Sequence, residues 1–309
     1  MKSIPSSRSS GSSVRLQTGR SWISSEVGFT VAETLVASVL GLMVSAMTLS
    51  FMSAHHFAMT RDSARTRVNQ NLRGTLDIMG ADLRVTGENL GKSFPAIEVT
   101  NGAGSAPDQL ILRRNLVDDV LPLCTALTAG TSITKVYFAI PGSVAGCTYS
   151  GQTHAYTSWE QYRTTHGGSV KAFIYDTSGK HGQFFTYQSA TNGGTSYYLN
   201  RDPGTWTYTY PTASSAVYIL EEWSFRLTNG MIELTENQTN ISNVSFGMTD
   251  MQVQVLMQDG TTKNSFTRSD AWTSILGVNL ALAASENYAG RTIARRLSGR
   301  FFPRNILSN

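Results

Sequence analysis

The sequence predicts an α+β protein in which one long N-terminal helix packs against an antiparallel β-sheet head. Residues 34–54 carry no charge, and an apolar stripe at helical spacing continues beyond them. From about residue 90, short β-prone runs alternate with Gly, Pro, Asn and Asp. The chain has 309 residues, of which 40% are hydrophobic and 15% charged, so it is too apolar to be disordered. Its 27 glycines argue against a helix bundle.

Residues 1–28 differ in composition from the rest of the chain. They contain ten serines, four basic residues and one acidic residue, and they show no apolar period. We expect this segment to be a leader without a fold of its own. It carries about +3 of the formal charge of +4, which leaves a nearly neutral body. Since nucleic-acid binding needs a clustered basic face, we expect no nucleic-acid partner.

The uncharged run at residues 34–54 has the length of a membrane span. Its 21 residues would form a helix of about 31 Å, which matches a hydrocarbon core of roughly 30 Å. No small-x-small cleavage site closes the run, because Ser53-Ala54-His55 is followed by more helix-compatible sequence. The segment 29–54 is therefore predicted to be a membrane-spanning half of the helix.

The helix is expected to continue past the membrane as an amphipathic half, residues 55–86. Val68, Leu72, Leu76, Met79 and Leu83 form one apolar stripe among polar residues. Pro is absent from this stretch, and the Gly that follows it is a suitable stop. The stripe predicts that this half packs on a globular head.

Residues 87–309 are predicted to form that head. Asn229-Gly230 lies between two alternating apolar runs, which is the strongest short-range signal for a hairpin. Asp259-Gly260 marks a second possible hairpin that ends in a strand with Val278, Leu280 and Leu282 on one face. The other expected strand segments are Gln109–Arg113, Lys135–Ile140 and 217–227.

A distinctive motif precedes the apolar run. Gly28 is followed by Phe29, and Glu33 stands at the fifth position after Gly28. A carboxylate carried to bilayer depth costs on the order of 2.5–3.5 kcal/mol, so its charge must be neutralised or stay near the interface. A negative charge is favourable at a helix N-terminus. From the residues alone, an interfacial Glu without a function is an alternative.

These residues resemble the processing motif of the type IV prepilin family, which includes the pseudopilins of type II secretion. The resemblance implies that a prepilin peptidase cuts after Gly28 and that Phe29 becomes an N-methylated new N-terminus. It also implies that Glu33 pairs with the N-terminal amine of a neighbouring subunit in the filament. A fold with a long helix against a β-sheet head is the pilin design.

Two further features place the resemblance within the family. Major pilins often carry Pro where this chain has Ser50, which favours a minor subunit. The segment Thr292–Asn305 resembles the terminal segment of PilW-type minor pilins and J-type pseudopilins, in which a strand closes the sheet. The resemblance thus covers both ends of the chain and leaves residues 90–215 unassigned.

The resemblance implies a minor pilin of a type IV pilus that primes assembly or sits at the filament tip. Its partners would be other minor pilins and the major pilin, prepilin peptidase and the inner-membrane assembly platform. The protein would cross the inner membrane once, with a periplasmic head, before entering an extracellular pilus. One alternative is a minor pseudopilin of a type II secretion system. Another is a membrane-anchored periplasmic enzyme or sensor.

The two cysteines, Cys124 and Cys147, can form one disulfide bridge if the head is periplasmic. Two separate buried thiols are the alternative. A catalytic Cys would need a nearby His, and no spacing in the sequence indicates one. Because phosphate-binding loops and nucleophile motifs are also missing, we expect no enzyme and no cofactor.

Two sets of residues contain histidines that are candidate metal ligands. His55 and His56 are adjacent on a helix and point about 100° apart, so they make a poor pair. His154, Glu160 and His166 do not fit a helical pair of histidines, and we expect them to be surface residues of a loop. The sequence predicts no metal site.

Residues 149–210 are rich in aromatic side chains among Gly, Thr and Ser. Such residues suit short strands, and they also suit a contact surface for carbohydrate or protein. If the segment is an adhesive surface, replacing Trp159 and Trp206 by Ala would lower attachment while leaving piliation normal.

Overall fold

The computed structural model describes residues 28, 30–142, 144–288 and 290–308. Its contacts divide the chain into two units, Met1–Ala58 and Met59–Asn309. Helix α1, Val31–Val85, provides the helical residues of the first unit and the opening residues of the second. Gly87 follows the helix with φ +83°, a conformation that favours Gly. The predicted long helix, with its end before Gly87, is confirmed.

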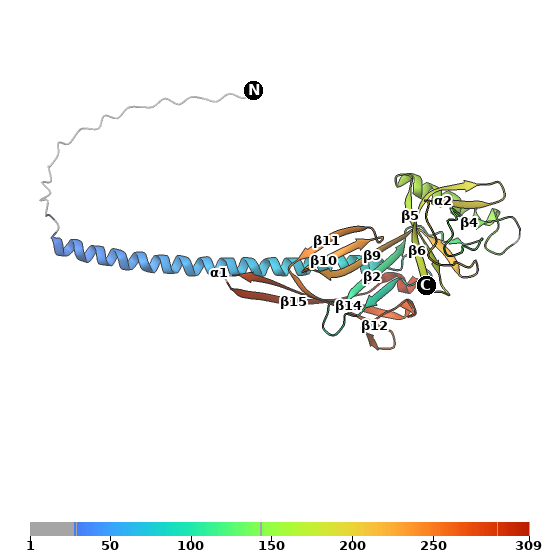
Figure 1. The fold of residues 1–309 in the computed structure, drawn as a ribbon. Coiled ribbons are helices and arrows are strands. Elements are labelled where there is room, and N and C mark those ends of the chain that lie inside the picture. The colour runs from blue at the N-terminus through green and yellow to red at the C-terminus, as the bar shows by residue number, and fades with distance from the viewer. Residues whose placement is uncertain (1–27, 29, 143, 289, 309) are drawn as a thin grey trace, which may run out of the picture. The chain divides into compact units, whose positions relative to one another are not determined.

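The described residues of the second unit form three antiparallel sheets rather than the single sheet that was expected (Figure 1). The first sheet has the order β1-β2-β9-β10-β11, the second β13-β12-β14-β15, and the third β3-β8-β5-β6-β7-β4. In the first sheet the strands are β1 Ile97–Thr100, β2 Gln109–Asn115, β9 Leu220–Thr228, β10 Met231–Glu236 and β11 Asn240–Phe246. In the second they are β12 Met248–Met257, β13 Thr262–Lys263, β14 Ile275–Tyr288 and β15 Arg291–Phe301. In the third they are β3 Leu121–Pro122, β4 Lys135–Ala139, β5 Val170–Asp176, β6 His181–Asn192, β7 Tyr197–Arg201 and β8 Ser215–Tyr218.

The predicted hairpin at Asn229-Gly230 is confirmed. Thr228 of β9 pairs with Met231 of β10, and the two turn residues have φ of 51° and 75°. Positive φ at both central residues is the requirement of a two-residue turn that matches the strand twist. The second predicted hairpin is more elaborate, since Asp259-Gly260 leads into the short β13 before the chain returns as β14.

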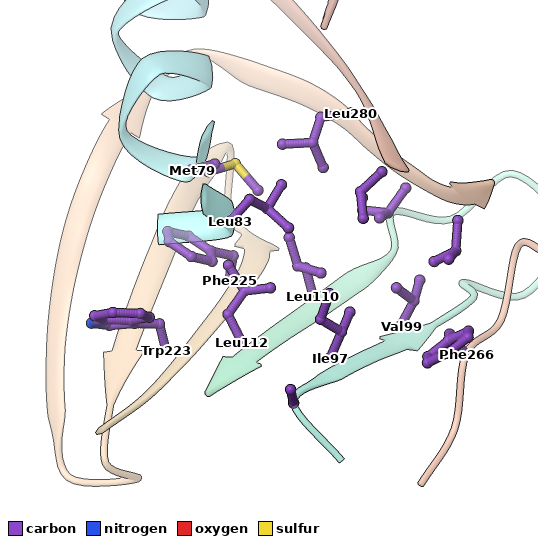
Figure 2. Close-up of a cluster of buried hydrophobic side chains, with 14 of the residues drawn as sticks. Met79, Leu83, Ile97, Val99, Leu110, Leu112, Trp223, Phe225, Phe266 and Leu280 are labelled. Carbon is purple, nitrogen blue, oxygen red and sulfur yellow. The ribbon is translucent and has the colours of Figure 1, made fainter. Parts of the chain in front are cut away.

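One hydrophobic core lies between the amphipathic half of α1 and the first two sheets. Figure 2 shows Met79 and Leu83 of α1 pointing toward Leu110, Phe225 and Leu280 of the sheets. The predicted stripe is buried throughout, since its side chains are at most 5% exposed. Burying such side chains contributes about 1.5–3 kcal/mol each, so this face of the helix is held by the hydrophobic effect.

A second core lies under the third sheet, mostly within residues 90–215, which the resemblance left unassigned. It includes Phe138, Trp159, Tyr187 and Trp206, all fully buried. Helix α2, Thr153–Thr165, covers part of this sheet where a loop was expected. Ala155 and Trp159, four residues apart, lie on its buried face. This spacing supports a helix even though Thr, Tyr and Gln dominate the rest of the segment.

Short helical turns complete the described chain. They are η1 Ser150–Gln152, η2 Trp272–Ser274 and η3 Arg304–Ser308. Strand β15 forms one edge of the second sheet, in the segment for which a closing strand was expected. In broad terms the α+β prediction is confirmed, although the structure contains more β-strands than the single predicted sheet would hold.

Candidate functional site

The candidate site is the start of α1 together with the predicted processing junction. Gly28 is exposed, and a Cβ added to it would meet no atom within 4 Å. Phe29 and residues 1–27, which include the rest of the predicted leader, lie outside the described residues. Glu33 lies in the first turn of α1, where the helix dipole favours a negative charge.

Glu33 and Thr30 form a reciprocal cap at this helix start. The backbone N–H and the hydroxyl of Thr30 each donate to Oε2 of Glu33 at 3.0 Å. In return, the backbone N–H of Glu33 donates to Oγ1 of Thr30 at 3.2 Å. This arrangement is a capping box, with Thr30 as the N-cap and Glu33 as the third helical residue. Glu33 therefore has a local structural role beside any role in assembly.

The capping role of Thr30 was not predicted, although the sequence contains a signal for it. The pattern Thr-Val-Ala-Glu at residues 30–33 was the available signal, because Ser or Thr followed three residues later by Glu or Gln precedes many helices. A capping Ser or Thr replaced by Ala costs about 0.5–2 kcal/mol.

The apolar half of α1 is exposed along its whole length. Its large apolar side chains between Val31 and Met52 are 49–82% exposed. Among the described residues, α1 is the one helix long and apolar enough to cross a membrane, and that segment is not buried. Such a helix can be a membrane anchor or a signal sequence. In either case its side chains need an apolar environment that the described chain does not supply.

The two cysteines are bonded in the structure. The Sγ atoms of Cys124 and Cys147 are 2.01 Å apart, and both residues are buried. The bridge connects the start of the third sheet to the segment that leads into α2. Because the two sulfurs are bonded to each other, neither cysteine is available as a thiolate nucleophile.

The structure does not gather His154, Glu160 and His166 into one site. His154 contacts Asp119, with Nδ1 and Oδ2 3.0 Å apart, whereas His166 stacks on Tyr162 at the end of α2. Both histidines are exposed, as expected. All three residues belong to α2 or its C-terminal cap, which corrects the prediction of a loop.

Glu160 is not simply a surface residue. Its carboxylate accepts hydrogen bonds from the guanidinium of Arg163, the hydroxyl of Tyr187 and the backbone N–H of Ala190. Although partial burial opposes this, these bonds together lower the pKa of the Glu160 carboxyl. Glu160 therefore ties α2 to β6. Among the described residues, no group of three or more His, Cys, Asp or Glu is placed to hold a metal ion.

The adhesion hypothesis for Trp159 and Trp206 is wrong in its choice of residues. Both side chains are at most 1% exposed. Their indole N–H groups donate to the backbone oxygens of Asp119 and Ile133, at 2.9 and 3.0 Å. Since neither ring can reach a partner, replacing it by Ala would act on folding through a core cavity.

A buried ion-pair cluster ties together the first sheet. Arg113 of β2 is 1% exposed, and its guanidinium contacts Glu222 at 2.6 Å and also Glu98. It donates to the backbone oxygen of Pro95 at 2.8 Å as well. Every charge in the cluster has a close partner, so we assign it a structural role.

Comparison of the chain with protein-family models, with curated proteins and with solved structures finds no match in any of the three.

Proposed function

We propose that this protein is a minor pilin of a type IV pilus, which primes assembly or occupies the filament tip after prepilin peptidase removes the leader. One observation carries the proposal. The Gly28-Phe29 junction stands immediately before a capped helix whose third residue is Glu33 and whose next 21 residues are uncharged.

The exposed apolar half of α1 supports a subunit that moves from a membrane into a filament. Each large apolar side chain left in water forgoes about 1.5–3 kcal/mol of burial. Lipid supplies this burial before assembly, and the helices of neighbouring subunits supply it afterwards. A cut before the helix, at Gly28, keeps this surface in the mature protein, whereas a cut after it would remove the surface.

Glu33 gives the assembly step its electrostatic component. Both capping bonds from Thr30 go to Oε2, so the same carboxylate can face a cation through Oε1. Cleavage after Gly28 creates such a cation, the amine of Phe29 on a neighbouring subunit. Pairing the two charges offsets the cost of bringing the carboxylate into an apolar helix bundle.

A minor role fits the chain better than a major one. Ser50 stands where many major pilins carry a helix-loosening Pro, and α1 is a regular helix through this position. The third sheet and helix α2, built by residues 116–219, enlarge the head, and a subunit placed at a tip has room for them.

The decisive measurement is the intact mass of the protein isolated from cells with and without prepilin peptidase. We expect a species that begins at Phe29 with one added methyl group, and the uncut chain when the peptidase is absent. A Gly28→Val variant provides the matched control, because the bulkier side chain should block cleavage in normal cells. A chain that keeps residues 1–28 in normal cells contradicts the proposal and favours a membrane-anchored enzyme or sensor.

A second measurement separates the pilus from its relative. Deletion of the gene should abolish or reduce surface pili. If the deletion leaves pili intact and instead stops the release of secreted enzymes, the protein is a minor pseudopilin of a type II secretion system, the family that Thr292–Asn305 also resembles.

A further inference from the structure

A polar groove crosses the outer face of the second sheet. It is a hollow of about 520 Å³ lined by residues of β12, β14 and β15. The opposite face of these strands is buried in the first core, since Val253, Val278, Leu280 and Leu282 are fully buried. The groove is therefore on the side of the sheet that faces away from the core. All of it belongs to the unit Met59–Asn309.

The strand register explains why the surface is hollow. Gln252 of β12 lies beside Ala281 of β14, and Ala281 lies beside Ser298 of β15. This cross-strand row has small side chains at two of its three positions, so it forms a low floor. Side chains two residues away along a strand point to the same face, so the rows on either side form the walls.

Two arginines stand on these walls. In one wall, Arg300 lies beside Asn279, and in the other Arg296 lies two residues beyond Ser298 along β15. Arg300 donates from Nε to Oδ1 of Asn279 at 2.8 Å, which fixes the direction of the guanidinium. Arg296 and Arg300 thus lie two residues to either side of Ser298 along β15, and their contacts direct the guanidinium groups toward Asp250 of β12 and Asn279 of β14.

The two arginines differ in how far they are neutralised. Arg296 forms one long ion pair, in which its Nη2 lies 3.9 Å from Oδ2 of Asp250, and its side chain stays mostly exposed. Among the described residues, Arg300 has no carboxylate within the 4.0 Å of an ion pair. The buried Arg113 shows the contrast, because it has two glutamates in direct contact. The groove thus presents guanidinium donors that an anionic ligand would satisfy.

We propose that this groove binds an acidic oligosaccharide. The carboxylate of a uronic acid unit would lie between Arg296 and Arg300, over Ser298. The amides of Gln252 and Gln254, with those arginines, would contact sugar hydroxyls, because an amide side chain offers both a donor and an acceptor. The volume falls within the range of about 300–1,000 Å³ that is typical of small-ligand sites.

Apart from its two arginines, the groove lacks the side chains on which protein interfaces are centred. Those anchors are mostly aromatic residues, Met and Arg. The groove contains no aromatic side chain or Met among its lining residues, and its one large apolar residue, Leu280, faces the core. A polar ligand can form hydrogen bonds with the side chains of the groove. An apolar protein surface would bury those side chains without hydrogen-bond partners, which costs free energy.

Titration calorimetry of the full chain in a mild neutral detergent tests the proposal. The probe is trigalacturonate, and maltotriose is the uncharged control of similar size. We expect saturable binding of trigalacturonate, which weakens as salt is raised, and binding of maltotriose at least about tenfold weaker, because charged hydrogen bonds discriminate by this amount or more. Absence of saturable trigalacturonate binding overturns the proposal.

Matched variants locate the site. The double variant Arg296→Gln/Arg300→Gln should weaken trigalacturonate binding by about tenfold or more. Arg291→Gln/Arg295→Gln removes the same charge from the opposite face of the same strand, and binding should change less than twofold. Equal weakening in both double variants would mean a general charge effect and overturns the proposal. If a triglutamate peptide binds more tightly than trigalacturonate, the proposal is also overturned, and the groove is instead a site for an acidic protein partner.

These outcomes are independent of the proposed function. Loss of trigalacturonate binding leaves the processing of Gly28 untouched, and an uncleaved leader leaves the groove intact. The two proposals can therefore fail separately.

Discussion

The packing of α1 against the C-terminal strand can be tested with one substitution made at two positions. Gly74 and Gly80 both lie inside α1, six residues apart. A Cβ on Gly74 would meet nothing within 4 Å, whereas a Cβ on Gly80 would lie 2.6 and 2.8 Å from Cδ1 and Cζ of Phe301, with Cε1 closer still. The ring of Phe301 is itself held, because the guanidinium of Arg84 lies over it at 5.5 Å.

The two substitutions should therefore change stability in opposite directions. Ala is better than Gly in a helix interior by about 0.5–1 kcal/mol, so Gly74→Ala should stabilise the protein by that amount. The same gain applies at Gly80, but overpacking against a held ring costs typically about 1–3 kcal/mol. The free energy of unfolding should thus fall by up to about 2 kcal/mol in Gly80→Ala. For a domain of this size, 1 kcal/mol of stability changes Tm by about 2–4 °C. Tm should therefore rise slightly in Gly74→Ala and fall by several degrees in Gly80→Ala.

Thermal unfolding of the full chain in detergent, followed by tryptophan fluorescence, measures both effects. Trp272, which lies in the same core, is a suitable probe. The variant Gly80→Ala/Phe301→Leu should recover part of the loss, since Leu leaves room for the new methyl group. If Gly80→Ala raises Tm as much as Gly74→Ala does, the close packing of Phe301 on α1 is refuted.

Three further predictions follow from named contacts. Glu33→Gln removes the charge but keeps the capping box, because Gln also caps at this position. Under the proposed function, the Glu33→Gln protein should be incorporated into sheared pili as poorly as the Glu33→Ala protein. Normal incorporation of Glu33→Gln would show that the charge is not needed. Replacing both Cys124 and Cys147 by Ser should lower the free energy of unfolding by about 3 kcal/mol, as expected for a bridge with a sequence separation of 23; a urea midpoint unchanged from that of the native chain would contradict this. Burial, and secondarily the charge of Glu221, raises the pKa of Asp82 to about 6, from 3.8. A carboxyl whose pKa is higher in the folded state loses stability as the pH rises from about 4 to about 6. Asp82→Asn should therefore raise Tm at pH 7 and leave it nearly unchanged at pH 4; an equal shift at both values would exclude the titration of Asp82 as the cause.

The parts of the fold that were predicted correctly are those specified by local pattern. The end of α1, its buried stripe and the hairpin at Asn229-Gly230 each depend on residues close together in the chain. The split of the alternating run 217–227 into β8 and β9 was missed, because Ile219 lies at a change of sheet. Local alternation is the same whether a strand stays in one sheet or passes into a second.

The second core was missed for a similar reason. Its strands pair across long separations, such as Leu121 with Val217 and Val136 with Leu199. Helix α2 of this region carries Thr, Tyr or Gln at most positions, so burial of Ala155 and Trp159 decides the structure against weak propensity. Tertiary contacts therefore determine this region, and Trp159 and Trp206, which the adhesion hypothesis placed at a contact surface, lie in its interior.

The candidate sites differ in the same way. The junction at Gly28 and the carboxylate of Glu33 lie within six residues, so a linear motif was enough to single them out. The arginine groove joins residues of β12, β14 and β15, and a count of charge over the whole chain hides it. Alternation along β15 sends Arg296 and Arg300 to one face and Arg291 and Arg295 to the other, and only the pairing of β15 with β14 determines which face lies over the core. A nearly neutral net charge is therefore compatible with a focused basic site, and the inference from net charge against nucleic acid does not extend to smaller anions.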